Sequence, residues 1–178
     1  MDDPRWATFD CYGTLVDWNA GIRAELDRLF GSAVGGKLLV RYHAVEPRVQ
    51  SEHPTWRYRD VMAAVLAELA SEAGVTLPAD ERDALGRSLP EWPVFVEVPG
   101  ALAEAHDRGW SLVALSNTDR DLIEASIKAI GSVGRFSCGP WCRAPAEAAK
   151  ARAARRSSAA GRAWTSACGP RALGSFDR

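Results

Sequence analysis

The stretch RWATFDCYGTLVDW, residues Arg5 to Trp18, decides the fold class of this chain. Its short apolar run, Trp6 to Phe9, predicts a buried strand that stops at an acid, Asp10. Gly13 then permits a sharp turn, and Thr14 adds a hydroxyl. Ligands of open parallel sheets bind just beyond the carboxyl ends of the strands, so Asp10 is a candidate site residue. On this spacing alone, an ordinary turn or helix-capping role for Asp10 stays open.

Composition narrows the class of protein. A chain of 178 residues is long enough for one domain, or for a core with a modest insertion. The net charge of −1 gives no electrostatic argument for a nucleic-acid or membrane partner. No apolar run approaches the ~18 residues of a membrane-spanning helix, and the acidic start MDDPRW lacks the apolar stretch of a signal peptide. We therefore expect a cytoplasmic protein. Four cysteines do not suggest a disulfide scaffold.

The middle of the chain has the periodicity of helices. Apolar residues at helical spacing predict helices over Asn19 to Phe30, Lys37 to Val49 and Tyr58 to Ala73. Leu77 to Trp92 predicts a further helix, with Asp80 as its N-cap. The segment from Pro93 to Val98 then alternates. Residues 18–97 are therefore expected to be a helical block with no strand of the parallel sheet.

After this block the chain returns to alternating elements. Pro99 to Arg108 predicts a helix that Gly109 ends. Trp110 to Leu115 predicts a strand, and the Ser116-Asn117-Thr118-Asp119 segment that follows is suited to capping the next helix, Asp121 to Ile130. The order of strand, helical insertion, helix, strand and helix predicts an α/β core that carries a helical cap.

These two segments carry a family resemblance. FDCYGTLVDW, a helical insertion and then LVALSNTDRDL resemble the haloacid dehalogenase superfamily, and more narrowly its 2-haloacid dehalogenase type II branch. The first motif of the superfamily matches at Asp10, Gly13 and Thr14, and the second matches at Ser116, with Asn117 in the form that dehalogenases use. Phosphatases of the superfamily have a second Asp where this chain has Tyr12, and type II dehalogenases have Tyr there. The resemblance covers roughly residues 5–136 and implies a Rossmann-like parallel-sheet core with a cap inserted after the first strand.

The resemblance also implies roles for these residues. Asp10 would be the nucleophile of a two-step hydrolysis, in which it forms an ester that water then cleaves. Thr14 and Ser116 would hold Asp10 and the substrate carboxylate, and Asn117 would help to receive the halide, although a helix-capping role for Asn117 stays open. Arg41, in the cap stretch VRYHAVEP, would be the cationic halide receiver, with a plain surface arginine as the alternative. The substrate would be a small 2-halo carboxylate, with no cofactor and no metal, and a homodimer stays open.

Tyr12 separates two chemistries. Cleavage of a phosphate ester releases an alkoxide, which usually needs a proton from a nearby acid. A halide leaves without protonation and needs only positive or hydrogen-bonding groups to receive it. A tyrosine with an unperturbed pKa of about 10 is a poor general acid, and it cannot replace an anionic magnesium ligand. Tyr12 therefore favours dehalogenation over a phosphatase, whether it binds substrate or halide or only packs under the cap.

The last 42 residues differ from the rest. From Ser137 to Arg178 there is no Val or Ile and only one Leu, and the charge is +6 against −7 for the preceding body. The family resemblance implies two further strands here, and buried parallel strands are rich in Val, Ile and Leu. The composition suggests a frameshift near 131–137. Lys150 is the tentative lysine of a third motif, but its EAAKARAA setting is that of an alanine-rich helix.

The expected organisation follows from these observations. We predict an incomplete α/β core over residues 1–17 and 98–136, a helical cap over 18–97 and an aberrant, poorly ordered tail over 137–178. The predicted function is that of a 2-haloacid dehalogenase-like hydrolase. The alternatives are a phosphatase of the same superfamily and a truncated, inactive remnant of the family.

Overall fold

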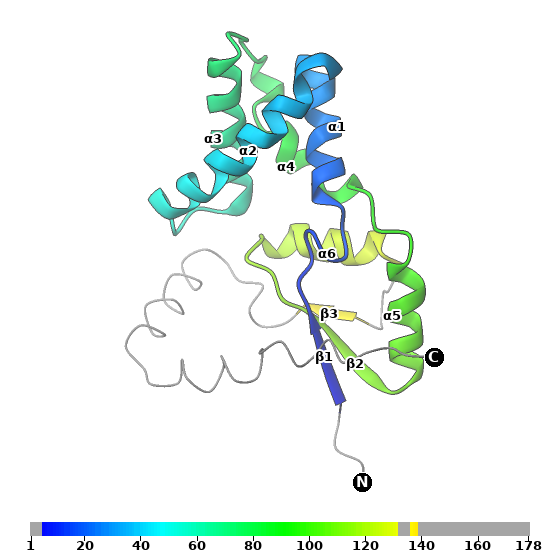
Figure 1. Cartoon of the computed structure of the whole chain (residues 1–178). Helices are drawn as coiled ribbons and strands as arrows, with labels where there is room; N and C mark the ends of the chain where they lie inside the picture. Colours follow the sequence, from blue (N-terminus) through cyan, green and yellow to red (C-terminus); the bar gives the residue numbers. More distant parts are fainter. Residues whose placement is uncertain (1–4, 132–135, 139–178) are drawn as a thin grey trace.

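A computed structural model describes residues 5–131 and 136–138 of the chain. Its sheet consists of β1 (Arg5–Phe9), β2 (Trp110–Ala114) and β3 (Phe136–Cys138), all parallel and in the order β1-β2-β3 (Figure 1). Phe9 lies opposite Ala114, and the Leu115 amide donates to the Phe9 carbonyl over 2.8 Å. Because parallel strands end at the same edge of a sheet, the residues that follow β1 and β2 lie together there.

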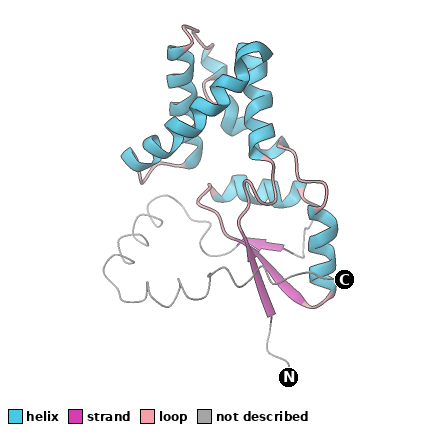
Figure 2. Ribbon diagram, in the orientation of Figure 1, coloured by secondary structure: helices cyan, strands magenta, loops and turns pink. Residues whose placement is uncertain are grey.

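The helices divide into two groups. Figure 2 shows the helices of the first group apart from the sheet, and Figure 1 shows α6 between the sheet and that group. The first group comprises α1 (Trp18–Phe30), α2 (Ser32–Glu52), α3 (Tyr58–Glu72), η1 (Ala79–Glu81), α4 (Ala84–Ser88) and η2 (Leu89–Glu91). The second group comprises α5 (Val98–Asp107) and α6 (Arg120–Ala129). This confirms the predicted α/β core with a helical cap, while the domain boundaries stay a prediction.

The chain crosses between sheet and cap twice, and the two crossings are bonded to each other. The Asp17 amide donates to the Pro93 carbonyl over 2.7 Å, and the Phe95 amide donates to the Leu15 carbonyl over 3.2 Å. Asp17 then caps α1 by accepting a hydrogen bond from the Ala20 amide at 3.0 Å. The paired crossings hold the start of the cap directly beside the turn that follows β1.

A buried tryptophan lies where the cap meets the core. Trp92, at the end of η2, is buried, and η2 packs against α6. A Cβ added to Gly21 of α1 would lie 2.2 Å from Cγ of Trp92, so the indole occupies the space that a side chain at position 21 would need. Trp92 belongs to one apolar cluster with buried aliphatic side chains of both parts, among them Ile22, Leu26, Val65, Leu66, Leu69 and Leu85 in the cap and Leu112, Ile123 and Ile127 in β2 and α6.

Two expectations about the elements are wrong. β1 forms as predicted, but Trp6 is 59% exposed, because β1 lies at the end of the described strand order. The predicted helix Leu77 to Trp92 is broken into η1, α4 and η2, with Asp80 inside η1 instead of at an N-cap. Pro90, which lacks the amide that a continuous helix needs, lies where α4 gives way to η2. The alternating segment Pro93 to Val98 contributes only an isolated bridge between Val94 and Val16, so residues 18–97 hold no strand of the parallel sheet, as predicted.

Among the described residues, no helix is long and apolar enough to cross a membrane.

Candidate active site

Asp10 lies directly after β1, exposed at the carboxyl edge of the sheet. The Thr14 hydroxyl donates to its Oδ2 over 3.3 Å. The turn between them is tight, because the amides of residues 14, 15 and 16 all point at the Cys11 carbonyl and Gly13 adopts a φ of 93°. The fold therefore brings together Asp10 and Thr14 of the first motif, with the carboxylate exposed.

Tyr12 is held by groups on both sides of the cap–core junction. Its hydroxyl lies 3.0 Å from Oγ of Ser126 in α6, and its ring meets that of Trp92 edge-on, with the centroids 6.2 Å apart. The side chain is therefore part of the packing between α6 and the cap. A neutral phenol hydrogen-bonded to a serine is poorly suited to replace the carboxylic acid of a phosphatase.

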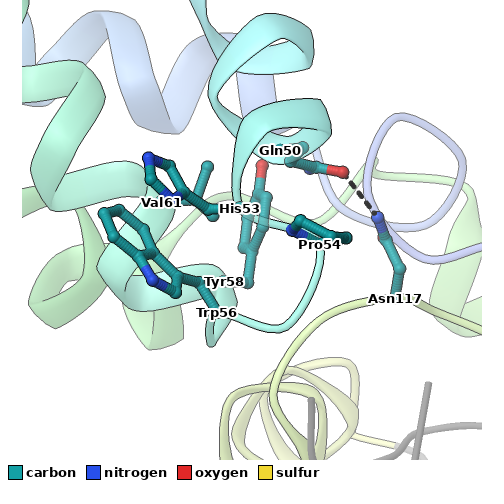
Figure 3. A pocket seen from close by; sticks show the side chains of 7 residues that line it. All are labelled: Gln50, His53, Pro54, Trp56, Tyr58, Val61 and Asn117. Atoms are coloured by element: carbon teal, nitrogen blue, oxygen red, sulfur yellow. Dashed lines mark hydrogen bonds between the residues drawn. The ribbon is translucent and has the colours of Figure 1, made fainter. Parts of the chain in front are cut away.

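Ser116 and Asn117 follow β2 at the same edge of the sheet. The Ser116 Oγ accepts a hydrogen bond from the Thr118 amide at 3.2 Å, which shapes the turn. The Asn117 Nδ2 reaches across to the cap and donates to Oε1 of Gln50 over 3.4 Å (Figure 3). Asn117 thus forms the core side of a hollow whose cap side consists of Gln50, His53, Pro54, Trp56, Tyr58 and Val61.

A buried acid, Glu46, orients the side-chain amide of Gln50. The Gln50 Nε2 donates to Glu46, one helical turn earlier on α2, which leaves its Oε1 to accept from Asn117. Burial raises the pKa of the Glu46 carboxyl, and hydrogen bonds from Gln50 and Tyr58 oppose this rise. Neither Glu46 nor Gln50 was identified from the sequence, because two polar residues four apart are ordinary on a helix surface.

Asp119 does not cap its own helix. It precedes α6, but its side chain makes no capping bond there. Its carboxylate instead accepts hydrogen bonds from the amides of Tyr58 and Arg59 at the start of α3, at 3.2 and 3.1 Å. The expectation that the Ser116–Asp119 segment caps the next helix is therefore not met by the Asp119 side chain, because tertiary packing provides it with amide donors on the cap side.

The predicted cation, Arg41, is engaged elsewhere. Its guanidinium binds Glu72 of α3 through two nitrogens, with Nη2–Oε1 at 2.6 Å, and it also lies 3.4 Å from Glu68. Glu72 raises the pKa of Arg41, and Arg41 lowers that of Glu72. The halide-receiving role of Arg41 stays a prediction, and this pairing gives it no support. Lys150 lies outside the described residues. Among residues 5–131, no cluster of three His, Cys, Asp or Glu side chains is arranged to hold a metal ion.

The sequence also matches a protein-family model. The model of the haloacid dehalogenase-like hydrolases matches residues 4–162. The chain belongs to this family. The match extends past Cys138 into the segment whose composition differs from the rest of the chain. No curated protein matches the sequence.

Solved structures with the same fold include dehalogenases. An L-2-haloacid dehalogenase from Xanthobacter autotrophicus with chloropropionic acid covalently bound superposes with a TM-score of 0.64 at 17% identity, covering 74% of this chain and 54% of that one. Another dehalogenase gives 0.64 at 18% identity, with coverages of 78% and 62%. A further L-2-haloacid dehalogenase gives 0.66 at 24% identity, with coverages of 89% and 76%. The chain thus spans 54% to 62% of the first two proteins.

Proposed function

We propose that this chain is a hydrolase of the 2-haloacid dehalogenase type, which acts on a small 2-halo carboxylate. The observation that carries the proposal is the carboxyl edge of the sheet, where Asp10, bonded to Thr14, follows β1 and the Ser116-Asn117 pair follows β2. An exposed carboxylate beside hydroxyl and amide groups can attack a carbon while its neighbours bind the anionic parts of the substrate.

The reaction has two steps. An Asp10 carboxylate oxygen attacks C2 of the substrate, a C–O bond forms, and the halide leaves with the electron pair of the C–halogen bond. Water then hydrolyses the ester, which restores the Asp10 carboxylate and releases a 2-hydroxy acid and a proton. The halide needs a hydrogen-bond donor, and the amide of Asn117 is a candidate at this edge. We assign no cofactor and no metal to these steps.

Tyr12 argues against the phosphatase alternative. A phosphatase of this superfamily needs a second carboxylic acid two residues after Asp10, and the hydroxyl in that place is bonded to Ser126. The neighbour from Xanthobacter autotrophicus contains covalently bound chloropropionic acid, which makes 2-chloropropionate the natural probe.

The test compares two activities in the same preparations. Chloride release from each enantiomer of 2-chloropropionate and phosphate release from a generic phosphate ester are measured, with and without Mg²⁺, at high enzyme concentration. We expect metal-independent chloride release that falls by about a thousandfold or more in Asp10→Asn, since the nucleophile is lost. Asp107→Asn, an exposed aspartate at the end of α5, is the matched control and should retain the parent rate. Magnesium-dependent phosphate release that Asp10→Asn abolishes would reject the proposal.

A further inference from the structure

The loop after β2 is bound to the cap by a buried carboxylate. Asp119 is 7% exposed, and its two oxygens accept from the Tyr58 amide, the Arg59 amide and Nε of Arg59, at 3.2, 3.1 and 3.2 Å. Tyr58 and Arg59 are the first two residues of α3, where helix amides have no partner within the helix. We call these three hydrogen bonds the Asp119 anchor.

The anchor connects the two walls of the hollow shown in Figure 3. Asn117 lies two residues before Asp119, and the loop of residues 53–57 directly precedes the anchored amides. This loop is ordered by its own packing, because the rings of His53 and Trp56 stack at 3.6 Å with planes 6° apart. A movement of the start of α3 would therefore move the His53–Trp56 wall relative to Asn117.

We propose that Asp119 is a positioning residue for the proposed reaction, which fixes the cap wall of residues 53–57 over Asn117. The catalytic consequence of this inference rests on the proposed function, whereas the three hydrogen bonds of the Asp119 anchor are independent of it. Arg59 also pairs with Asp121, whose side chain is 68% exposed. Exposed ion pairs contribute little to stability, so the buried Asp119 bonds are expected to dominate.

Hydrogen exchange tests the anchor without reference to activity. In the parent chain the Tyr58 and Arg59 amides should exchange slowly, although they begin a helix beside an exposed loop. Asp119→Asn keeps the side-chain size but replaces one acceptor oxygen with an NH₂ group, so these amides should exchange roughly tenfold faster. Asp121→Asn is the matched control, because it removes the exposed partner of the same arginine, and it should change exchange by less than about twofold.

Two exchange results would overturn the inference. Unprotected Tyr58 and Arg59 amides in the parent would do so even if Asp119→Asn failed to fold. Equal effects of the Asp119 and Asp121 substitutions would also do so. Amides in the middle of α3, such as that of Leu66, report whether a variant has loosened the whole cap.

Kinetics test the positioning role. A wall that contacts substrate equally in the ground and transition states affects KM more than kcat. We expect Asp119→Asn to raise the KM for 2-chloropropionate about tenfold, with kcat within about threefold of the parent, and Asp121→Asn to match the parent. A fall in kcat at constant KM would contradict the role. If the parent releases no halide, the proposed function fails, and the exchange experiment still decides whether the anchor exists.

Discussion

At the scale of single residues, Glu46 shows how burial and hydrogen bonding oppose each other beside the site. Its carboxyl is almost fully covered, yet Gln50 donates to it and thereby presents an acceptor to Asn117. Burial disfavours the ionised form, and the raised pKa of Glu46 shows that burial is the larger effect. The orientation of the Asn117 amide therefore depends on a group that the reaction does not touch.

This balance predicts a pH dependence of stability. Because the folded pKa of Glu46 lies above the unfolded value of about 4.3, the folded state binds this proton more tightly. The stability that Glu46 contributes is present below about pH 4.3 and is lost as the pH rises through its folded pKa. We expect Glu46→Gln to match the parent in free energy of unfolding near pH 4 and to exceed it at pH 7.

Urea unfolding at several pH values measures this effect. The control is Glu52→Gln, an exposed glutamate on the same helix, which should stay within ~0.5 kcal/mol of the parent throughout. A Glu46→Gln variant that is less stable than the parent at pH 7 would show that the hydrogen bonds, and not burial, decide the energy of this carboxyl.

At the scale of elements, the contact of Gly21 in α1 with Trp92, the residue after η2, leaves no room for a side chain at position 21. Ala is normally better than Gly in a helix by about 1 kcal/mol. Gly21→Ala should nevertheless destabilise the protein by roughly 1–3 kcal/mol, because the new methyl group would displace the buried Trp92 ring. Gly100→Ala, in α5 with no atom near the added Cβ, should instead stabilise the protein by ~0.5–1 kcal/mol. Thermal unfolding of both variants measures the two signs, and a stabilised Gly21→Ala would refute the packing argument.

The elements also show what the sequence can and cannot predict. Strong periodicity, together with residues that end a helix, correctly predicted β2, α3 and the helix that ends before Gly109. The φ of 82° at Gly109 explains why that helix ends there. Partners that depend on tertiary structure were missed. The side chain of Asp119 bonds to α3, 60 residues earlier in the chain, and Arg41 binds two glutamates of α3. Short polar residues beside a helix look the same in sequence whichever helix they cap.

The same limit applies to the site. Asp10, Thr14, Ser116 and Asn117 could be placed at one edge because each follows or flanks a strand, and parallel strands end together. Their roles stay proposals. Gln50 and Glu46 could not be found, since they lie on a long cap helix whose rotation about its axis is fixed by packing, and no motif marks the residues that face the core.

At the scale of the whole molecule, the electrostatics of the proposed reaction extend beyond the described residues. Attack by Asp10 on a carboxylate substrate brings two negative charges together and needs a nearby cation. The family resemblance implies a lysine for this task, and Lys150 is the candidate by position. Its EAAKARAA setting, in a segment without Val or Ile, does not resemble the end of a buried strand. We therefore expect the chain to release halide orders of magnitude more slowly than an intact relative.

If this expectation is correct, Lys150 contributes little to the rate of halide release. Lys150→Ala should change halide release by less than about twofold, as should Lys128→Ala, an exposed lysine of α6 that serves as its matched control. A loss of about a hundredfold in Lys150→Ala alone would make this lysine the missing cation, and a parent kcat in the ordinary range of about 1–10³ s⁻¹ would contradict the expectation of a slow enzyme.

The coding DNA across residues 131–137 provides a second test of the same expectation. If another reading frame encodes a Val- and Ile-rich strand followed by Lys-Pro and an acidic loop, restoring that frame should raise the rate by orders of magnitude, because the cation would then lie beside Asp10 at the edge where β1 and β2 end.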